Sequence, residues 1–316
     1  MSFIRRIPIP MSGLALGAAA LGNLLLPYSP IARAVCGAVS AVLVIMITLR
    51  IAFDFQAVRA ELKNPAILAV FPTFFMALML LATYLKPYAA APAKALWVAA
   101  LVLQLLVSAV FLVRFVGAFK LAQVLPSWFL IFVGFVVASV TSPAFEAVAL
   151  GRILAYAGMA GYVAILPVVV YRMVKAGDLP EPVLPTVVIF AAPPSLCLVG
   201  YLAVAPVKQV GVVYALLGMA AVSLLYVFTR LPRILTNRFC PSCSALTFPI
   251  VISAIAFKQS SLFFATAGAG PLAPPGVVAA IDAAVVLLVA YVAVRYAFLL
   301  LSPGAEPQLA AEPATA

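Results

Sequence analysis

Few side chains in this 316-residue sequence could take part in a chemical reaction. The sequence has no histidine, which is the commonest general base, proton relay and metal ligand near neutral pH. Its eight acidic residues are scattered along the chain, and they form no serine-triad, phosphate-loop or paired-carboxylate arrangement. The sequence therefore predicts a protein that is not an enzyme, with no catalytic residues, no cofactor and no metal.

The cysteines are the remaining reactive side chains, and they lie at positions 36, 197, 240 and 243. All four fall inside or beside long apolar runs, which is not the setting of a disulfide framework. Cys240 and Cys243 form a C-x-x-C pair, but a redox or zinc role needs a thioredoxin-like βαβ unit or two further ligands. Neither is visible in the sequence, so we expect no redox or zinc role for the pair. A membrane-embedded enzyme or redox protein that uses these two cysteines is the alternative hypothesis from another functional class.

The segment after these cysteines carries the side chains best placed to meet a solute. At 100° per residue, Ser244, Phe248, Lys258 and Gln259 share one face of a helix. Phe248 directly precedes Pro249, so its ring would lie at a bend and could close a narrow lumen. Lys258 lies about 15 Å further along the helix, where it could attract anions or reach lipid headgroups. We predict Phe248 as a pore gate and the other three as pore-lining or anion-attracting residues.

The amino-acid composition indicates which type of secondary structure must position these residues. Hydrophobic residues make up 67% of the chain and charged residues only 9%, against roughly 25% charged in soluble domains. Hydrocarbon must therefore be the main solvent, and the long continuous apolar runs favour helices over strands. The 19 Lys and Arg residues outnumber the acids, but they stand singly between apolar runs. That pattern is typical of membrane-orientation signals and predicts no nucleic-acid partner.

Ten stretches approach the roughly 20 apolar residues that a helix needs to cross a bilayer. The first could be taken for a signal peptide, since it follows Arg5 and Arg6, but we interpret it as the first span. Residues 1–301 then form one transmembrane channel domain, and the Ala-, Pro- and Glu-rich residues 302–316 form a disordered cytoplasmic tail. The ten stretches are 10–26, 31–53, 65–85, 92–117, 126–145, 149–174, 185–204, 209–229, 241–264 and 275–301.

The positive charges predict how the chain is oriented in the membrane. Cytoplasmic loops carry an excess of Lys and Arg, and the two sides of a ten-span chain differ in this respect. The side with both termini holds thirteen of these residues, at 5, 6, 50, 59, 63, 114, 120, 172, 175, 230, 233, 238 and 295. The other side holds six, at 33, 86, 94, 152, 208 and 258. We therefore expect a multi-pass protein of the plasma (inner) membrane, with both termini in the cytoplasm.

A repeat relates the odd-numbered spans to one another. Each opens with a proline, and these prolines follow one another at intervals of 55 to 61 residues, at Pro10, Pro65, Pro126, Pro185 and Pro241. Seven or eight residues later each odd span has a residue that weakens a helix, namely Gly17, Pro72, Gly134, Pro193 and Pro249. The pattern predicts five helical hairpins, with five kinked inner helices around a central pore and five outer helices around them.

Several short motifs resemble the tellurite-resistance/dicarboxylate transporter family, which includes bacterial TehA and the plant guard-cell slow anion channels. They occur in order along residues 7–300, as Pro8-Ile-Pro10 with Gly13, Val58-Arg-Ala-Glu61 with Asn64-Pro65, Pro126-Ser127, and Thr247-Phe248-Pro249. The sequence differs from the family in two respects. It has the C-x-x-C pair, and it has no long regulatory termini like those of the plant channels. The second difference puts control by phosphorylation in doubt.

This resemblance implies a homotrimer in which each ten-helix protomer has its own pore, with Phe248 as the residue that blocks it. The expected solutes are small inorganic anions such as chloride and nitrate, or dicarboxylates such as malate, and membrane lipid is the expected surrounding. Our interpretation is a passive anion channel. The alternative is a secondary carrier for C4-dicarboxylates or tellurite-type oxyanions, with or without proton coupling. Coupling through a buried carboxylate is disfavoured, because no odd span has an acid near its middle.

Overall fold

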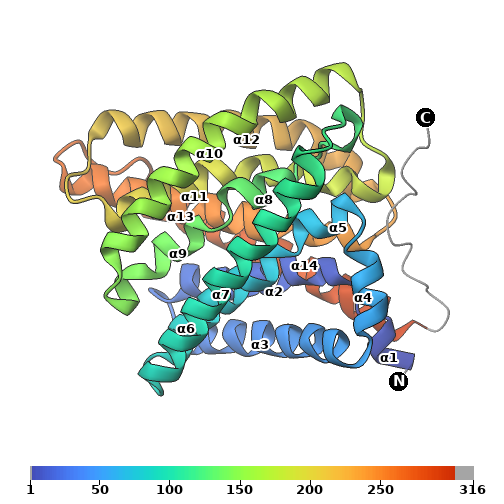
Figure 1. Cartoon of the computed structure of the whole chain (residues 1–316). Coiled ribbons are helices and arrows are strands. Elements are labelled where there is room, and N and C mark those ends of the chain that lie inside the picture. Colours follow the sequence, from blue (N-terminus) through green and yellow to red (C-terminus); the bar gives the residue numbers. More distant parts are fainter. Residues whose placement is uncertain (1, 303–316) are drawn as a thin grey trace.

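The computed structural model describes residues 2–302, and in this range the chain is entirely helical, without β-strands. The tail expected to be disordered, residues 302–316, lies outside the described residues except for Ser302. Continuous apolar sequence explains the helices, since a helix satisfies its backbone hydrogen bonds within one segment. Figure 1 shows the helices running side by side as a bundle.

Eight segments of the described chain are long and apolar enough to cross a membrane. Five of them are long helices, namely α3 (Pro30–Phe53), α7 (Ala90–Phe111) with the π-turn η2 (Leu112–Val116), α10 (Val148–Lys175), α12 (Val210–Thr236) and α14 (Pro275–Leu301). Three are each built from two pieces, namely α5 (Pro65–Val70) with α6 (Pro72–Leu85), η5 (Glu181–Ala191) with α11 (Ala192–Val204), and η6 (Pro241–Leu246) with α13 (Phe248–Thr266).

Two further apolar segments are shorter. They are η1 (Ile9–Met11) with α2 (Ser12–Leu25), and α8 (Trp128–Val133) with α9 (Val136–Thr141) and η4 (Ser142–Phe145). Of the ten predicted spans, eight are thus confirmed as helical segments with the length and hydropathy needed to cross a membrane. The remaining helical pieces are α1 (Ser2–Arg5), α4 (Phe55–Glu61) and η3 (Leu121–Gln123).

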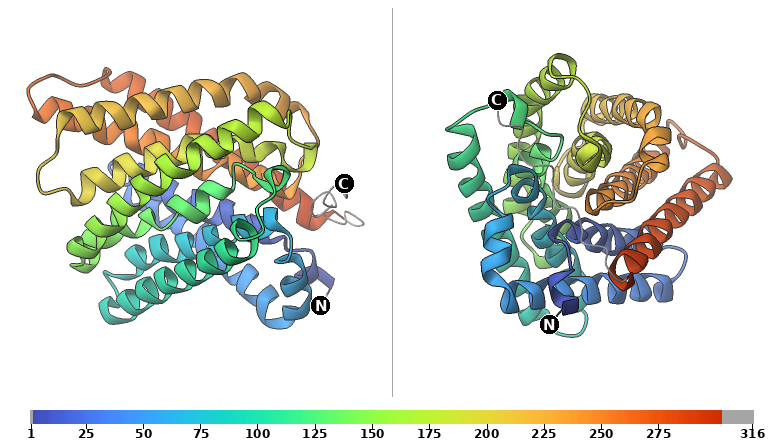
Figure 2. Two further views of the ribbon diagram at one scale, coloured as in Figure 1. Left: turned by 45° about the horizontal axis from the view of Figure 1, so that its top comes forward. Right: turned by 90° about the vertical axis from the view of Figure 1, so that its right-hand side faces the viewer.

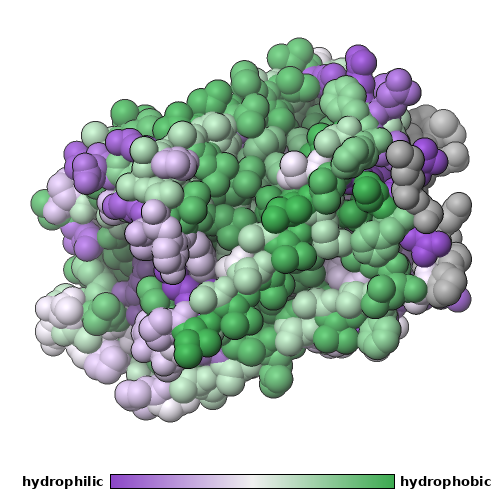
Figure 3. All heavy atoms as spheres, turned by 90° about the horizontal axis from the view of Figure 1, so that it is seen from below, coloured by the Kyte–Doolittle hydropathy of each residue, from purple (hydrophilic) through white to green (hydrophobic). Residues whose placement is uncertain are grey.

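The outer surface of the bundle suits a lipid environment. Figure 3 shows a broad hydrophobic band over the middle of the molecule, with hydrophilic residues gathered toward its two ends. Large apolar side chains on α3, α7, α10, α12 and α14 point outward, among them Ile31, Leu106, Val174, Leu225 and Leu301. In water such a surface would be costly, whereas in hydrocarbon it needs no cover. The chain is a multi-pass membrane protein.

The segments divide into a buried and an exposed set. In the three long two-piece segments, 56–94% of the most apolar stretch is buried, against 22–33% in α3, α7, α10, α12 and α14. The short α2 is buried along almost its whole length. The buried pieces also touch one another in a closed sequence, because α2 contacts α6, α6 contacts α9, α9 contacts α11, α11 contacts α13, and α13 contacts α2. The right-hand view of Figure 2 looks along this arrangement.

Both described chain ends lie at one end of the bundle, which we call the terminal end. The Arg6 guanidinium donates a hydrogen bond to the carbonyl of Ser302 there, at 3.3 Å. Nearby, a buried ion pair joins Arg50 of α3 to Glu61 of α4. Burial raises the pKa of the Glu61 carboxyl above its usual value, while Arg50 acts in the opposite direction. This pair fixes the short loop that leads into α5, where Asn64 caps the helix.

Four of the five predicted helix-weakening residues lie at interruptions. Pro72 begins α6 directly after the end of α5, and Gly134 lies between α8 and α9. Pro193 is in the first turn of α11, where the tighter 3-10 helix η5 changes to an α-helix. Pro249 is in the first turn of α13, after Thr247 leaves the helical region at φ −91° and ψ −82°. Each interruption falls within a buried segment, where neighbouring protein can compensate the lost hydrogen bonds.

The helix break expected at Gly17 is not present, because α2 continues without interruption from Ser12 to Leu25. The change of helix type in this segment comes earlier, between η1 and α2. Gly17 instead allows close packing, since a Cβ placed on it would lie 2.4 Å from the Thr247 hydroxyl oxygen. A glycine is needed at this position because two backbones approach each other there. A lone glycine destabilises a helix by only about 1 kcal/mol, so α2 continues through it.

Candidate functional site: a cavity lined by the five buried segments

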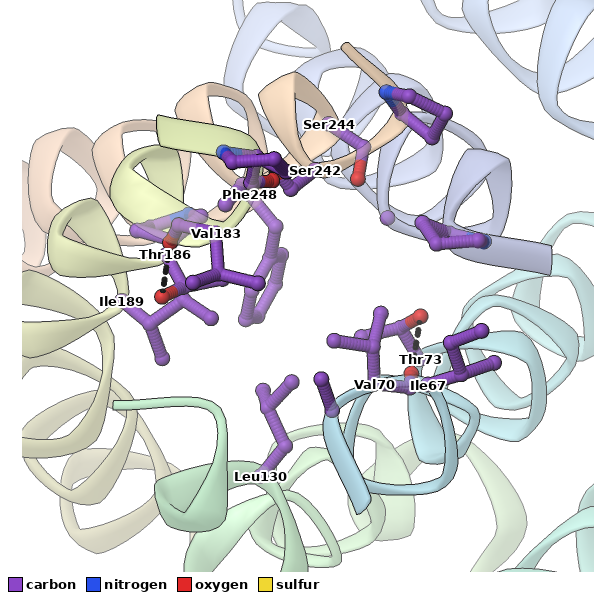
Figure 4. A pocket seen from close by; sticks show the side chains of 17 residues that line it. Ile67, Val70, Thr73, Leu130, Val183, Thr186, Ile189, Ser242, Ser244 and Phe248 are labelled. Carbon is purple, nitrogen blue, oxygen red and sulfur yellow. Dashed lines mark hydrogen bonds between the residues drawn. The ribbon is translucent and has the colours of Figure 1, made fainter. Parts of the chain in front are cut away.

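The buried segments enclose a cavity of about 60 Å³ near the terminal end. All five of them contribute to its wall, which makes it the place where the odd-numbered segments converge. Figure 4 shows their side chains pointing into the shared space. The lining residues are Pro10, Gly13, Ala66, Ile67, Val70, Thr73, Leu130, Pro182, Val183, Thr186, Ile189, Pro241, Ser242, Ser244, Ala245, Phe248 and Pro249.

Phe248 lies between this cavity and a second, much smaller one. The second cavity has about 10 Å³ of space and is lined by four of these segments, with residues that include Met76, Gly134 and Pro193, but by none of η1–α2. Three side chains border both cavities, namely Leu130, Ile189 and Phe248. The Phe248 side chain is 3% exposed, and Figure 4 shows its ring projecting into the space between the lining residues. A space of roughly 10 Å³ is at the lower limit for holding one water molecule, so the free space narrows sharply beside the ring.

The wall of the larger cavity is mostly apolar, with a few hydroxyl groups. Thr73 donates to the Val70 carbonyl at 2.8 Å and shares a 2.7 Å hydrogen bond with Ser12. Thr186 donates to the Val183 carbonyl at 2.6 Å. Ser244 is one of the wall residues, and its role in lining a pore stays a prediction. No charged side chain is among the lining residues of either cavity in the described chain. Such a wall offers a passing ion weak polar contacts and no fixed charge to bind it tightly.

The segment that carries Phe248 is held in place by α2. The Thr247 hydroxyl lies 2.9 Å from the carbonyl oxygen of Gly13 and 2.7 Å from that of Ser244, and its single hydrogen is shared between these two acceptors. The two glycines Gly13 and Gly17, one helical turn apart, let α2 approach Ser244 and Thr247 at contact distance. The sharp turn at Thr247 is therefore fixed on both sides, and with it the direction in which the Phe248 ring points.

Comparison with known families agrees with this arrangement. The model of the voltage-dependent anion channel family matches residues 6–298, which is nearly the whole chain. The chain belongs to the voltage-dependent anion channel family. This confirms the resemblance seen in the motifs, and it assigns the chain to a family of channels and transporters rather than of enzymes. No curated protein matches the chain.

The other two residues predicted to line the path or attract anions, Lys258 and Gln259, lie away from both cavities. Gln259 is exposed, and Lys258 forms an ion pair with Asp282 of α14, with 2.9 Å between Nζ and the nearer carboxylate oxygen. The ammonium of Lys258 also lies 4.2 Å from the ring centre of Tyr28, whose hydroxyl donates to the same carboxylate at 2.8 Å. The positive charge of Lys258 is thus balanced locally. Its role in attracting anions stays a prediction, which the reversal potential of Lys258→Met in a salt gradient tests.

The same pair leads to a prediction about stability. The Asp282 side chain is only 4% exposed, so replacing Lys258 by Met leaves a buried carboxylate without its cation. Losing one partner of a buried pair typically costs about 3–5 kcal/mol. We expect Lys258→Met to lower the melting temperature of the purified protein clearly, and the double variant Lys258→Met/Asp282→Asn to recover most of the loss. A double variant no more stable than Lys258→Met would show that the two side chains do not depend on each other.

Leu130 and Ile189 are functional candidates that the sequence analysis missed. Both border the constriction beside Phe248, and both lie four residues before a helix-weakening residue, Gly134 and Pro193. That shared spacing could have pointed to them, since residues one turn apart lie on the same helix face. Among the described residues, no group of three or more His, Cys, Asp or Glu side chains could hold a metal ion.

Proposed function

We propose that the protein is a passive, anion-selective channel whose path runs through the cavity and past Phe248. The observation that supports this best is the position of the Phe248 ring between two cavities, the larger lined by all five buried segments and the smaller by four of them. The net charge of +11 favours anions over cations around such a path, and the uncharged wall would bind them weakly. Chloride and nitrate, which dehydrate easily, are the solutes that we expect to pass best.

In this proposal the two short buried segments also cross the membrane. With η1–α2 and α8–η4 counted, the chain has ten spans, arranged as five hairpins of one buried and one exposed member. The prolines and interruptions then belong to the five inner helices, and the five long exposed helices surround them. The homotrimer and the cytoplasmic position of the terminal end, in the plasma (inner) membrane, complete the proposal. They rest on the family resemblance and on the excess of Lys and Arg at that end.

Flux measurements on purified protein in phospholipid vesicles test this function. We expect chloride and nitrate to leave loaded vesicles down their gradients when a potassium ionophore balances the charge. An imposed pH gradient should not drive accumulation, because no acidic side chain lines the described cavity wall. Malate taken up against its gradient, dependent on the pH difference, would instead establish the alternative, a proton-coupled carrier for C4-dicarboxylates; the same assay with tellurite examines oxyanions.

A further inference from the structure

Cys240 and Cys243 lie within reach of each other at the start of the segment that carries Phe248. Their sulfur atoms are 3.6 Å apart, and both thiols are free. The Cys243 N–H donates to the Cys240 carbonyl at 2.9 Å, and the Cys240 N–H approaches the Cys243 sulfur at 3.4 Å. This is one turn of the 3-10 helix η6, in which residues three apart lie directly above one another. A disulfide bond needs the sulfurs at roughly 2.05 Å, so its formation requires the two side chains to rotate toward each other.

The pair also lies where a small reagent can reach it and where its state can affect the pore. Cys240 is half-buried and Cys243 is buried, which gives one accessible thiol and one protected thiol. The two residues between them, Pro241 and Ser242, both line the cavity. The Pro241 carbonyl accepts a hydrogen bond from Tyr296, near the end of α14, which places the pair toward the terminal end. From the sequence alone we expected no redox role, and this placement is what the sequence could not show.

We propose that Cys240 and Cys243 form a reversible disulfide at the mouth of the pore, and that the disulfide holds the Phe248 gate closed. This regulation rests on the proposed function. The oxidant is a small-molecule disulfide of the glutathione type. The Cys240 thiolate attacks one of its sulfurs and expels the first small thiolate, which leaves a mixed disulfide. The Cys243 thiolate then attacks the Cys240 sulfur and expels the second. The cysteines lose two protons and two electrons, and the small disulfide gains both.

The effect on the gate follows from the contacts of η6. In the reduced state the Cys240 thiol lies 3.7 Å from the carbonyl oxygen of Pro182, and Ser242 donates to the same oxygen at 2.5 Å. Bond formation draws the Cys240 sulfur toward Cys243 and fixes the η6 turn in the geometry that it has while Phe248 closes the path. Because η6 ends at the bend that aims Phe248, a rigid η6 opposes any tilt of α13 that would move the ring.

Two measurements on vesicles of purified protein test the proposal, after treatment with oxidised glutathione or with dithiothreitol. The first is the mass after alkylation of free thiols and digestion. We expect the peptide with Cys240 and Cys243 to change between doubly alkylated when reduced and disulfide-linked when oxidised. The second is chloride efflux, which we expect to be about fivefold lower in the oxidised protein and restored by reduction. Phe248→Ala should conduct equally in both states, because it lacks the ring that the disulfide holds.

Matched variants separate this proposal from the proposed function. Cys240→Ser, which lacks the attacking thiol, should conduct as the reduced protein does under both treatments, whereas Cys36→Ala/Cys197→Ala should keep the full redox response. The proposal is overturned if oxidation gives only mixed disulfides or alkylated thiols at these positions, or if the disulfide forms and wild-type efflux does not change. If no variant passes anions, Phe248→Ala included, the proposed function fails, and the mass measurement still reports whether the disulfide forms.

Discussion

Replacing Phe248 by Ala should raise anion efflux through the purified protein by about tenfold or more, since a barrier lower by about 1.4 kcal/mol has that effect on a rate. The ring borders both the cavity of about 60 Å³ and the much smaller space of about 10 Å³. Removing it joins the two, and a wider, wetted path no longer excludes ions as a dry apolar constriction does. Efflux of chloride from vesicles with equal protein content, compared with wild type, gives the ratio.

The control for this variant is Phe264→Ala on the same helix. Phe264 is as buried as Phe248, at 2% exposure, but it packs against Tyr214 and lines neither cavity. Truncating a well-packed phenylalanine costs about 3–5 kcal/mol, so Phe264→Ala should lose stability without gaining efflux. Equal efflux from the two variants would mean that loosened packing, rather than an opened gate, lets the anions through.

The Gly17→Ala variant should be destabilised by about 1–3 kcal/mol, the usual range for an overpacked site. Its new methyl group would lie 2.4 Å from the Thr247 hydroxyl oxygen and 3.0 Å from the Phe248 backbone nitrogen. Either α2 or the bend at Thr247 must then move, and the hydrogen bond from Thr247 to Gly13 weakens. We therefore expect a lower melting temperature together with a raised chloride leak, because the same bend aims the Phe248 ring.

A second glycine provides the comparison. Gly218 lies in α12, and a Cβ placed there would meet nothing within 4 Å. Replacing a helical glycine by alanine normally stabilises by about 0.4–1 kcal/mol when the site has room. Gly218→Ala should therefore leave the melting temperature unchanged or raise it, with no effect on leak. If Gly17→Ala behaves in the same way, the close packing of α2 against Thr247 is not what positions the gate.

The sequence predicted the membrane class, the exposed helices and the positions of four interruptions, because these depend on local properties. A long apolar run must be helical in lipid. A proline lacks the backbone N–H that an interior position of a helix needs, whatever its surroundings. Phe248 and Ser244 could be placed on one helix face by angle alone, and the structure finds both on the cavity wall. The resemblance of the motifs to the family then led to the expectation that Phe248 on this face blocks the pore.

The remaining features depend on contacts between distant segments, which one sequence does not display. A glycine in an apolar segment fits both a kink and a close contact, and only the position of Thr247 shows which applies at Gly17. The angle of 100° per residue places Lys258 on the same helix face as Phe248. It does not show that Lys258 pairs with Asp282, which is on another helix. The C-x-x-C pattern alone predicts no redox role, because its setting, a 3-10 turn at the cavity wall, appears only after folding.

The reversal potential of the Phe248→Ala current in a chloride gradient tests the central claim most directly. If anions cross a path that the Phe248 ring closes, the current is large and reverses near the chloride equilibrium potential, while wild type and Phe264→Ala carry little. A Phe248→Ala current no larger than that of Phe264→Ala, or one that reverses at the equilibrium potential of the cation, would contradict it.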